Sequence, residues 1–498
     1  MWTRCAFVGS ALMLAIMSVS SAGAAPCIAG APNVCVIADR SASEVLVALT
    51  VPVGAAAEGP GQHGVAHYLE HLTFRDRTVE TGEPSSGTVG IDRYGNAYTT
   101  PFATTYHWTV PPERGSEAIM RALAVLGPLD LSPAVAEQER EIVQREREQR
   151  LADPWSKRAG AIEAVLYGGT ALERSLIGTA EEVEALSAEA ALAFHAEYYD
   201  PEDAVLVVAG AVDHLTLAGA MVRGRTAAGI GTVAANAHRG GEGAGERPPG
   251  PPDVAARILA STPVAEHVVV SGPFGAPERT ADALTIAPPD ATTVAAADLI
   301  GAYLNSALPG SPRVALEKGG ERVSDAVADD VREATFALRE LAPGLVGTGV
   351  TLRLRPSVKT DRAEVALVDA WSAWNDEWSA LRENGIPAEA FERMHTRAIT
   401  DLDRQRDDAV ASAWSLIGWL EAGADPSEWV EYPSILAALT LERTNAVLDT
   451  LGKPVRSVVT DALPAPTSFT IKPSSPLEGT WSNGGVAGTS RSEAFRHD

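Results

Sequence analysis

The residues of this chain best suited to chemistry lie together in the segment His67-Tyr68-Leu69-Glu70-His71. On a helix, positions i and i+4 lie one turn apart on the same face, so His67 and His71 can present two imidazoles to one metal ion. Glu70 flanks that face and can reach a water molecule without binding the metal itself. With a third protein ligand and one open position, this arrangement is typical of catalytic zinc, with Glu70 as general base.

Other interpretations of the histidines stay open at this point. His63 precedes His67 by four positions and could replace His71 as a ligand. However, Gly64 weakens a helix between them, and that pairing leaves Glu70 without a geometric role. The pair could also be two solvated or core histidines on a helix, and a zinc-storage site would need no Glu70.

The third ligand must come from another element, and a helical pattern from Pro133 to Leu151 offers two candidates. Glu139 and Glu146 are seven positions apart, so they lie on one stripe of that helix together with Ile142 and Val143. This apolar pair places both carboxylates on the inward side, where a metal and its histidines would supply the partners that buried charges need. From the helix alone, a solvated charged face remains an alternative.

The positioning elements follow from periodicity and turn residues. Strands are predicted over 45–51, 98–110 and 204–209, and helices over 65–74, 133–151 and onwards to about 199. Trp371, Trp374 and Trp378 recur with helical spacing and predict a face packed into a core. The Gly- and Pro-rich segment 238–255 predicts a linker between an N-terminal catalytic domain (25–237) and a C-terminal domain (256–465), and a disordered tail follows (466–498).

The N-terminus predicts export. Residues 1–24 combine a positive start, an apolar run and a small-residue cleavage pattern, as in a secretory signal peptide. Its removal leaves no expected membrane span and a periplasmic or secreted protein. Cys27 and Cys35 then remain, and an oxidising compartment favours a disulfide between them over two unpaired thiols.

Composition excludes several classes of protein. Lys and Arg number 40 and Asp and Glu 65, so the formal net charge is 40 − 65 = −25, which disfavours nucleic acid as a partner. With 45% hydrophobic and 21% charged residues, the chain is neither a disordered polyelectrolyte nor a multi-span membrane protein. The sequence contains neither a G-x-S-x-G nor a P-loop motif.

The histidine motif and its surroundings resemble the insulinase or pitrilysin (M16) family of zinc peptidases. Glu146 follows His71 by 75 positions in an E-x-x-[VI]-x-x-x-E context, as the family's downstream ligand does. Further matching segments extend the resemblance over about residues 44–213: Gly64-Val65-Ala66, Gly95-Asn96-Ala97-Tyr98-Thr99, Leu176-Ile177-Gly178-Thr179 with Glu181, and Tyr198-Tyr199-Asp200-Pro201 before a strand.

The resemblance implies roles for the candidate residues. His67, His71 and Glu146 would bind one zinc ion per chain, Glu70 would be the general base, and Glu139 would orient a ligand histidine.

The resemblance also implies a substrate mode and a fold. Asn96 and Ala97 would lie on an edge strand to which the backbone of a peptide substrate adds. The fold would be α+β: two related α/β domains, each a sheet with helices packed on one side, forming half of a clamshell. A second copy, or a related inactive chain, would complete a homodimer or heterodimer whose chamber admits peptides or small unfolded proteins.

The second half departs from the family pattern. Residues 311–316 resemble the start of the C-terminal signature, but Glu317 stands where the family has an Arg and Ser324 where it has a Tyr. From the intact motif of the first half, we expect an exported zinc endopeptidase. The alternative is a weak or inactive partner subunit of a heterodimer.

Overall fold

The computed structural model describes residues 27–30, 32–74, 89–230, 264–272, 274–287, 290–342, 345–464 and 471–474. The predicted signal peptide and the linker 238–255 lie outside these residues. Within the predicted tail 466–498, the structure describes residues 471–474. They form a strand rather than an irregular segment. Among the described residues, no helix combines the length and the apolar character needed to cross a bilayer.

The chain divides into two compact units, and neither is continuous in sequence. The first comprises 1–148, 174–250 and 402–431, and the second comprises 149–173, 251–401 and 432–498. Each half of the sequence thus gives one segment to the unit of the other half. Helix α6 (Pro154–Tyr167) belongs to the second unit and helix α16 (Ala409–Glu421) to the first. The sequence predicted two contiguous domains from its Gly- and Pro-rich linker. A helix that packs with the unit formed mainly by the other half of the chain leaves no local signal in the sequence.

The first unit is built on a six-stranded sheet of order β1-β2-β6-β3-β5-β4. Only β2 and β6 pair in parallel, and β4 lies at an edge. The strand β3 is buried along its whole length, which explains its Val- and Leu-rich sequence. The strand bounds are β1 Cys27–Ile28, β2 Asn33–Ala38, β3 Val45–Val51, β4 Gly95–Thr99, β5 Thr104–Val110 and β6 Val205–Gly210.

The single strand predicted over 98–110 is in fact two strands. β4 ends at Thr99 and β5 begins at Thr104, and Thr100 N donates to Ala103 O over 2.8 Å in the turn between them. Pro101 lies in this turn and has no N–H to donate to a ladder, so the strand cannot continue through it.

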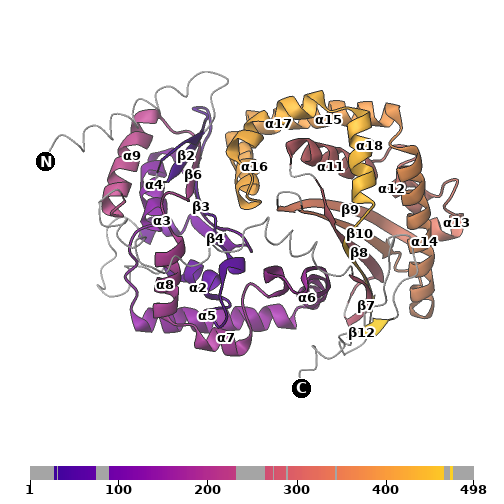
Figure 1. Cartoon of the computed structure of the whole chain (residues 1–498), viewed down its shortest axis with the longest axis horizontal. Coiled ribbons are helices and arrows are strands. Elements are labelled where there is room, and N and C mark those ends of the chain that lie inside the picture. Colours follow the sequence, from indigo (N-terminus) through magenta and orange to yellow (C-terminus); the bar gives the residue numbers. More distant parts are fainter. Residues whose placement is uncertain are drawn as a thin grey trace. The chain divides into compact units, whose positions relative to one another are not determined.

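Most helices of the first unit pack on one face of this sheet, as expected, and a single described helix lies on the other face (Figure 1). Most of them bury a large core against one face, including residues of α2 and α4, whereas α16 packs its own apolar side against the other face. The helices of the first unit are α2 Val65–Thr73, α3 Val89–Asp92, α4 Gly115–Ala124, α5 Pro133–Ala152, α7 Ala180–Ala185, α8 Ala188–Tyr198, α9 His214–Ala227 and α16, with short 3₁₀ turns at Ala55–Ala57 and Pro112–Arg114.

The second unit repeats this plan. Its sheet has the order β12-β7-β11-β8-β10-β9, and β11 and β7 form its parallel pair as β2 and β6 do in the first. The expectation of two related α/β domains is thereby confirmed. Its strands are β7 Val264–Gly272, β8 Glu278–Ile286, β9 Val331–Ala342, β10 Leu345–Leu354, β11 Arg456–Pro464 and β12 Ile471–Ser474.

Helices of the second unit bury the predicted tryptophan face. Trp371, Trp374 and Trp378 of α14 are at most 7% exposed, which confirms that this helix face enters a core. The helices are α6, α11 Ala291–Leu304, α12 Pro312–Lys318, α13 Asp325–Asp330, α14 Thr360–Asn384, most of α15 Ala388–Asp407 and α18 Leu441–Leu451, and Ala171–Glu173 is a 3₁₀ turn. The ends of α5 and α15 and the middle of α17 (Pro426–Ala438) cross boundaries between the units.

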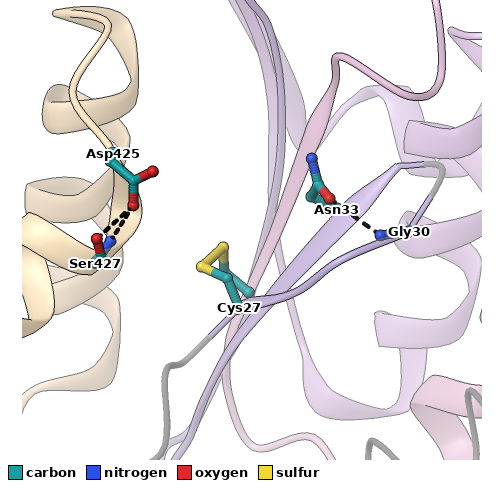
Figure 2. The surroundings of a disulfide bond; sticks show 6 residues. Cys27, Gly30, Asn33, Asp425 and Ser427 are labelled. Atoms are coloured by element: carbon teal, nitrogen blue, oxygen red, sulfur yellow. Dashed lines mark hydrogen bonds between the residues drawn. A yellow bond between two sulfur atoms is a disulfide. The ribbon is translucent and has the colours of Figure 1, made fainter.

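A disulfide joins the first two strands. Cys27 and Cys35 lie directly opposite each other on β1 and β2, and their sulfur atoms are bonded (Figure 2). Gly30 N donates to Asn33 Oδ1 over 3.0 Å and closes the turn between these strands. The short hairpin is therefore held at both ends.

Candidate metal centre

The helix that carries the histidine motif begins at a glycine that no other residue can replace freely. Gly64 has a φ of 89°, and a Cβ atom built on it would lie 2.5 Å from the carbonyl oxygen of Ile177. Both the left-handed backbone and the close approach of another chain segment require glycine here. The sequence pattern G-x-A-H thus has a physical cause at its first position.

A distant carboxylate caps this helix. Glu58 accepts hydrogen bonds from Gly64 N and Ala66 N, both over 2.9 Å, and it is 8% exposed. Burial raises the pKa of Glu58 to about 7, although the two backbone hydrogen bonds oppose this shift. Glu58 thereby satisfies N–H groups at the start of α2 that have no partner within the helix.

His67, His71 and Glu146 converge at one point. Glu146 Oε2 lies 3.5 Å from Nε2 of His67 and 3.5 Å from Nε2 of His71. One ligand atom of each of the three residues lies within 4.8 Å of the others. A tetrahedral zinc ion with ligand bonds of about 2.1 Å needs donor atoms about 3.4 Å apart, so the donor set and the two separations of 3.5 Å fit such an ion.

Glu139 supports the second imidazole from behind. It is 4% exposed, and its Oε2 lies 3.3 Å from Nδ1 of His71. An ionised carboxylate only accepts, so His71 donates through Nδ1 and its Nε2 lone pair is directed to the metal position. Burial lowers the pKa of His71, but the hydrogen bond to Glu139 and the charges of Glu70 and Glu146 outweigh it and raise that pKa. The site therefore favours a cation.

Glu70 lies beside this cluster and is held by the edge strand. It is 8% exposed, and Thr99 Oγ1 donates to its Oε2 over 2.7 Å. Nearby, the hydroxyls of Tyr106 and Tyr199 are 2.8 Å apart, and the charge of Glu70 contributes, after burial, to raising the pKa of each. A carboxylate fixed at this point can exchange a proton with a molecule held at the metal position.

In the part of the chain that the structure describes, β4 has no second strand beside it, so alternate residues direct their backbone groups to an unpaired side. Tyr94 O accepts from Thr109 N over 3.2 Å, and in an antiparallel ladder the residues that bond to the neighbour alternate with residues that do not. The backbone groups of Gly95, Ala97 and Thr99 therefore point away from β5. Asn96 Oδ1 accepts from Ala97 N over 3.0 Å, so this side chain covers one outward N–H.

His63 lies with a different set of side chains. Its ring nitrogens are 3.7 Å from Glu58 and 3.9 Å from Glu182, and Arg174 approaches Nε2 to 2.6 Å. Burial, followed by the charge of Arg174, lowers the pKa of His63. The structure thus places His63 at the start of α2 rather than with the His67–His71 pair.

Sequence reasoning missed Glu58 and Thr99, which hold α2 and Glu70. Glu58 precedes the helix by six or more positions, so no helical periodicity includes it. Tyr68 was also missed: its hydroxyl donates to Ala136 O over 2.6 Å and ties α2 to α5. A Tyr in a helix between ligand residues gives no indication of its partner from sequence alone.

The two departures in the C-terminal half have structural roles. Glu317 Oε1 accepts from Arg313 Nε and from Ala334 N, each over 3.1 Å. Ser324 caps α13, where its Oγ accepts from Val327 N. Both side chains are therefore used within the second unit.

Comparisons with known proteins find similarity over part of the chain to one family. Residues 33–180 match the model of the family described as Insulinase (Peptidase family M16). An uncharacterized zinc protease of Mycobacterium leprae (strain TN) is 34% identical over 178 residues, covering 35% of this chain and 39% of that protein. A probable mitochondrial-processing peptidase subunit beta of Schizosaccharomyces pombe is 29% identical over 182 residues, covering 35% and 38%. The chain thus spans less than half of the length of these curated relatives.

Solved structures match nearly the whole described chain. A putative M16-like peptidase from Alicyclobacillus acidocaldarius superposes with a TM-score of 0.65 at 19% identity, covering 88% of this chain and 98% of that one. The periplasmic protease PqqL from Escherichia coli gives 0.67 at 15%, covering 89% and 48%. A peptidase M16 inactive domain from Pseudomonas fluorescens gives 0.64 at 13%, covering 88% and 98%. At these identities the likeness shows the fold.

Proposed function

Because residues 33–180 belong to the insulinase family of peptidases (M16), we propose that this chain is a zinc-dependent endopeptidase that cleaves peptides or small unfolded proteins. The observation that carries the proposal is the convergence of His67, His71 and Glu146 on one point, with the buried Glu70 beside them. The predicted signal peptide and the Cys27–Cys35 disulfide support export to the periplasm or beyond.

In this proposal His67, His71 and Glu146 hold the metal, and Glu139 fixes the ring of His71. When bound, zinc supplies Lewis acidity, which polarises the peptide carbonyl and lowers the pKa of water. Glu70 takes a proton from the attacking water and later returns it to the leaving nitrogen, while Thr99 keeps the carboxylate in place.

The substrate backbone adds to the free side of β4. The outward groups of Gly95, Ala97 and Thr99 form a short ladder, and its Thr99 end lies next to Glu70. Asn96 must release Ala97 N before a peptide can pair there. An extended, unfolded segment is the kind of substrate that fits this edge.

The proposal is tested by Glu70→Gln, which removes the base and keeps the shape of the side chain. We expect zinc content to stay near one ion per chain, while cleavage of a quenched fluorescent peptide falls about 10²- to 10⁴-fold. The exposed Glu148 of α5 provides the control, because Glu148→Gln alters the same net charge away from the site. Unchanged cleavage in Glu70→Gln would eliminate the mechanism.

A second candidate is a partner subunit with little activity of its own. It is favoured by Glu317 and Ser324, which replace the family's expected anchors, and by the inactive M16 domain among similar structures. Size measurement on the purified chain distinguishes a monomer, a homodimer and a complex with a related chain. A zinc-loaded homodimer that cleaves peptides contradicts this candidate; a zinc-loaded chain that cleaves only after a related chain is added supports it.

A further inference from the structure

The two faces of the edge strand meet different surroundings. Successive side chains of a strand point to opposite faces, so Ala97 and Thr99 share the face of α2, where Thr99 contacts Glu70. Asn96 and Tyr98 then lie on the opposite face, the one that α16 covers. Among the described residues, β4 pairs with a single neighbouring strand, β5, so its position depends on what supports these faces.

Glu421 of α16 forms a hydrogen bond to this opposite face. Thr105 of β5 donates through Oγ1 to Glu421 Oε1 over 2.6 Å, although 316 positions separate them. Tyr98 is paired with Thr105 across the ladder, and burial, followed by the nearby carboxylate of Glu421, raises the pKa of its hydroxyl. Thr50 of β3 extends the chain of contacts, with its Oγ1 3.2 Å from that of Thr105. Glu421 thus joins α16 to β5 at Thr105, directly beside the ladder partner of that residue on β4, Tyr98.

The helix itself is fixed on the sheet, so Glu421 is a rigid support. Leu416 and Ile417 of α16 are at most 1% exposed within the core cluster on this face. Trp414 of the same helix contacts His107 of β5 edge to face, with ring centroids 4.9 Å apart. A carboxylate at the end of a packed helix loses little freedom when it binds Thr105 beside Tyr98.

We propose that Glu421 is a positioning residue that holds the substrate-accepting strand β4 in register from behind. The inference rests on the proposed function, because it assumes that a peptide pairs with the free side of β4. Through α16, the C-terminal half of the sequence then takes part in substrate binding, although it has Glu317 and Ser324 where the family has an Arg and a Tyr. Glu421 acts on KM and not on the proton transfer at Glu70.

The test compares three variants with wild-type zinc-loaded protein. Glu421→Leu removes the hydrogen bond to Thr105, and we expect KM to rise about 10-fold, with kcat and zinc content within about twofold. Glu421→Gln keeps an acceptor for Thr105, so it is expected to restore KM to within about threefold of wild type. Tyr98→Phe removes only a hydroxyl and serves if the Leu variant does not fold. The exposed Glu431 of α17 provides the matched control, Glu431→Gln.

Binding is measured separately from cleavage. In a Glu70→Gln background, the dissociation constant of a fluorescent peptide is measured by anisotropy with and without Glu421→Leu. Weaker binding on this change supports the inference even if the wild-type chain cleaves nothing, in which case only the proposed function fails. An unchanged KM and an unchanged dissociation constant in both Glu421→Leu and Tyr98→Phe would overturn it. Loss of kcat in step with KM, together with loss of zinc, would equally overturn it.

Discussion

Glu139 Oε2 lies 3.3 Å from Nδ1 of His71, on the side of the ring that faces away from Glu146. The charge of Glu139 orients this ring and makes its Nε2 a stronger metal ligand. Replacing Glu139 with Gln removes that charge. We expect zinc affinity to fall about 10- to 100-fold, because such supporting partners typically have effects of this size. Competition with a chromophoric chelator measures the dissociation constant directly, without any assay of activity.

The control for this prediction lies on the same helix. Glu141 is exposed and pairs with Arg145 at 3.8 Å, so Glu141→Gln changes the net charge equally without touching His71. The two variants are expected to differ in zinc affinity by at least about 10-fold. Equal affinities would mean that Glu139 does not orient the ligand.

Gly64→Ala is expected to destabilise the start of α2 far more than a similar change nearby. Gly61 also has a positive φ, 80°, but a Cβ atom there meets nothing within 4 Å, whereas at Gly64 it meets Ile177 O at 2.5 Å. Both changes incur a backbone cost of about 1 kcal/mol, and Gly64→Ala adds a clash of about 2 kcal/mol or more. Urea titration followed by circular dichroism compares the two variants. Equal losses would show that the segment at Ile177 moves away easily.

What the sequence could predict depended on the distance between partners along the chain. The i, i+4 spacing of His67 and His71 is set by helix geometry alone, and the predicted helix 65–74 agrees with α2. The inward stripe of Glu139 and Glu146 on α5 followed from the same periodicity.

Contacts between distant segments left no such signal. Glu58 reaches the first turn of α2 from outside the helix, and Glu421 reaches Thr105 across 316 positions. The exchange of α6 and α16 between the two units is of the same kind, because an amphipathic helix shows which face it buries but not against which sheet. The candidate metal ligands and Glu139 were therefore accessible from the sequence, whereas the supporting residues Glu58 and Glu421 were not.

Glu58 predicts a pH dependence of stability with a definite sign. Its pKa is about 7 in the folded chain against 4.5 ordinarily, so the folded state binds the proton more tightly. The contribution of Glu58 to the free energy of unfolding is fully present below pH 4.5 and is lost as the pH rises through 7. The free energy of unfolding falls by about 3 kcal/mol over this range. Glu58→Gln removes this ionisation, so urea titrations of the metal-free protein at pH 5 to 8 should show a flatter profile.

The comparison that isolates Glu58 uses an exposed acid. Glu137 of α5 is exposed, and Glu137→Gln is expected to leave the slope of stability against pH unchanged. The metal-free protein is used for all three chains because metal binding by histidines also depends on pH and would add a slope of its own. Parallel profiles for wild type and Glu58→Gln would contradict the prediction.

Asp461 at the centre of the second sheet predicts the opposite sign. It is fully buried, and it accepts from Arg279 Nε and Nη2 over 2.6 and 2.7 Å and lies 3.0 Å from Nε2 of His267. Burial raises the pKa of Asp461, but the hydrogen bonds from Arg279 and His267 and their charges outweigh it and hold that pKa below its ordinary value. The contribution of Asp461 to the free energy of unfolding is therefore present above pH 3.8, and it is lost as the pH falls through the pKa that Asp461 has in the folded chain.

Asp461→Asn tests this account, because it leaves the buried Arg279 without its counter-charge. Arg279 is 1% exposed, so water cannot replace the lost partner, and we expect the free energy of unfolding at pH 7 to fall by about 3 to 5 kcal/mol. The exposed Asp407 offers a control that changes charge equally, with an expected effect within about 0.5 kcal/mol. Since Asp461, Arg279 and His267 lie on β11, β8 and β7, the loss should appear in the second unit and leave zinc affinity at His67 and His71 unchanged. A loss below about 1 kcal/mol would show that the sheet tolerates an unpaired arginine.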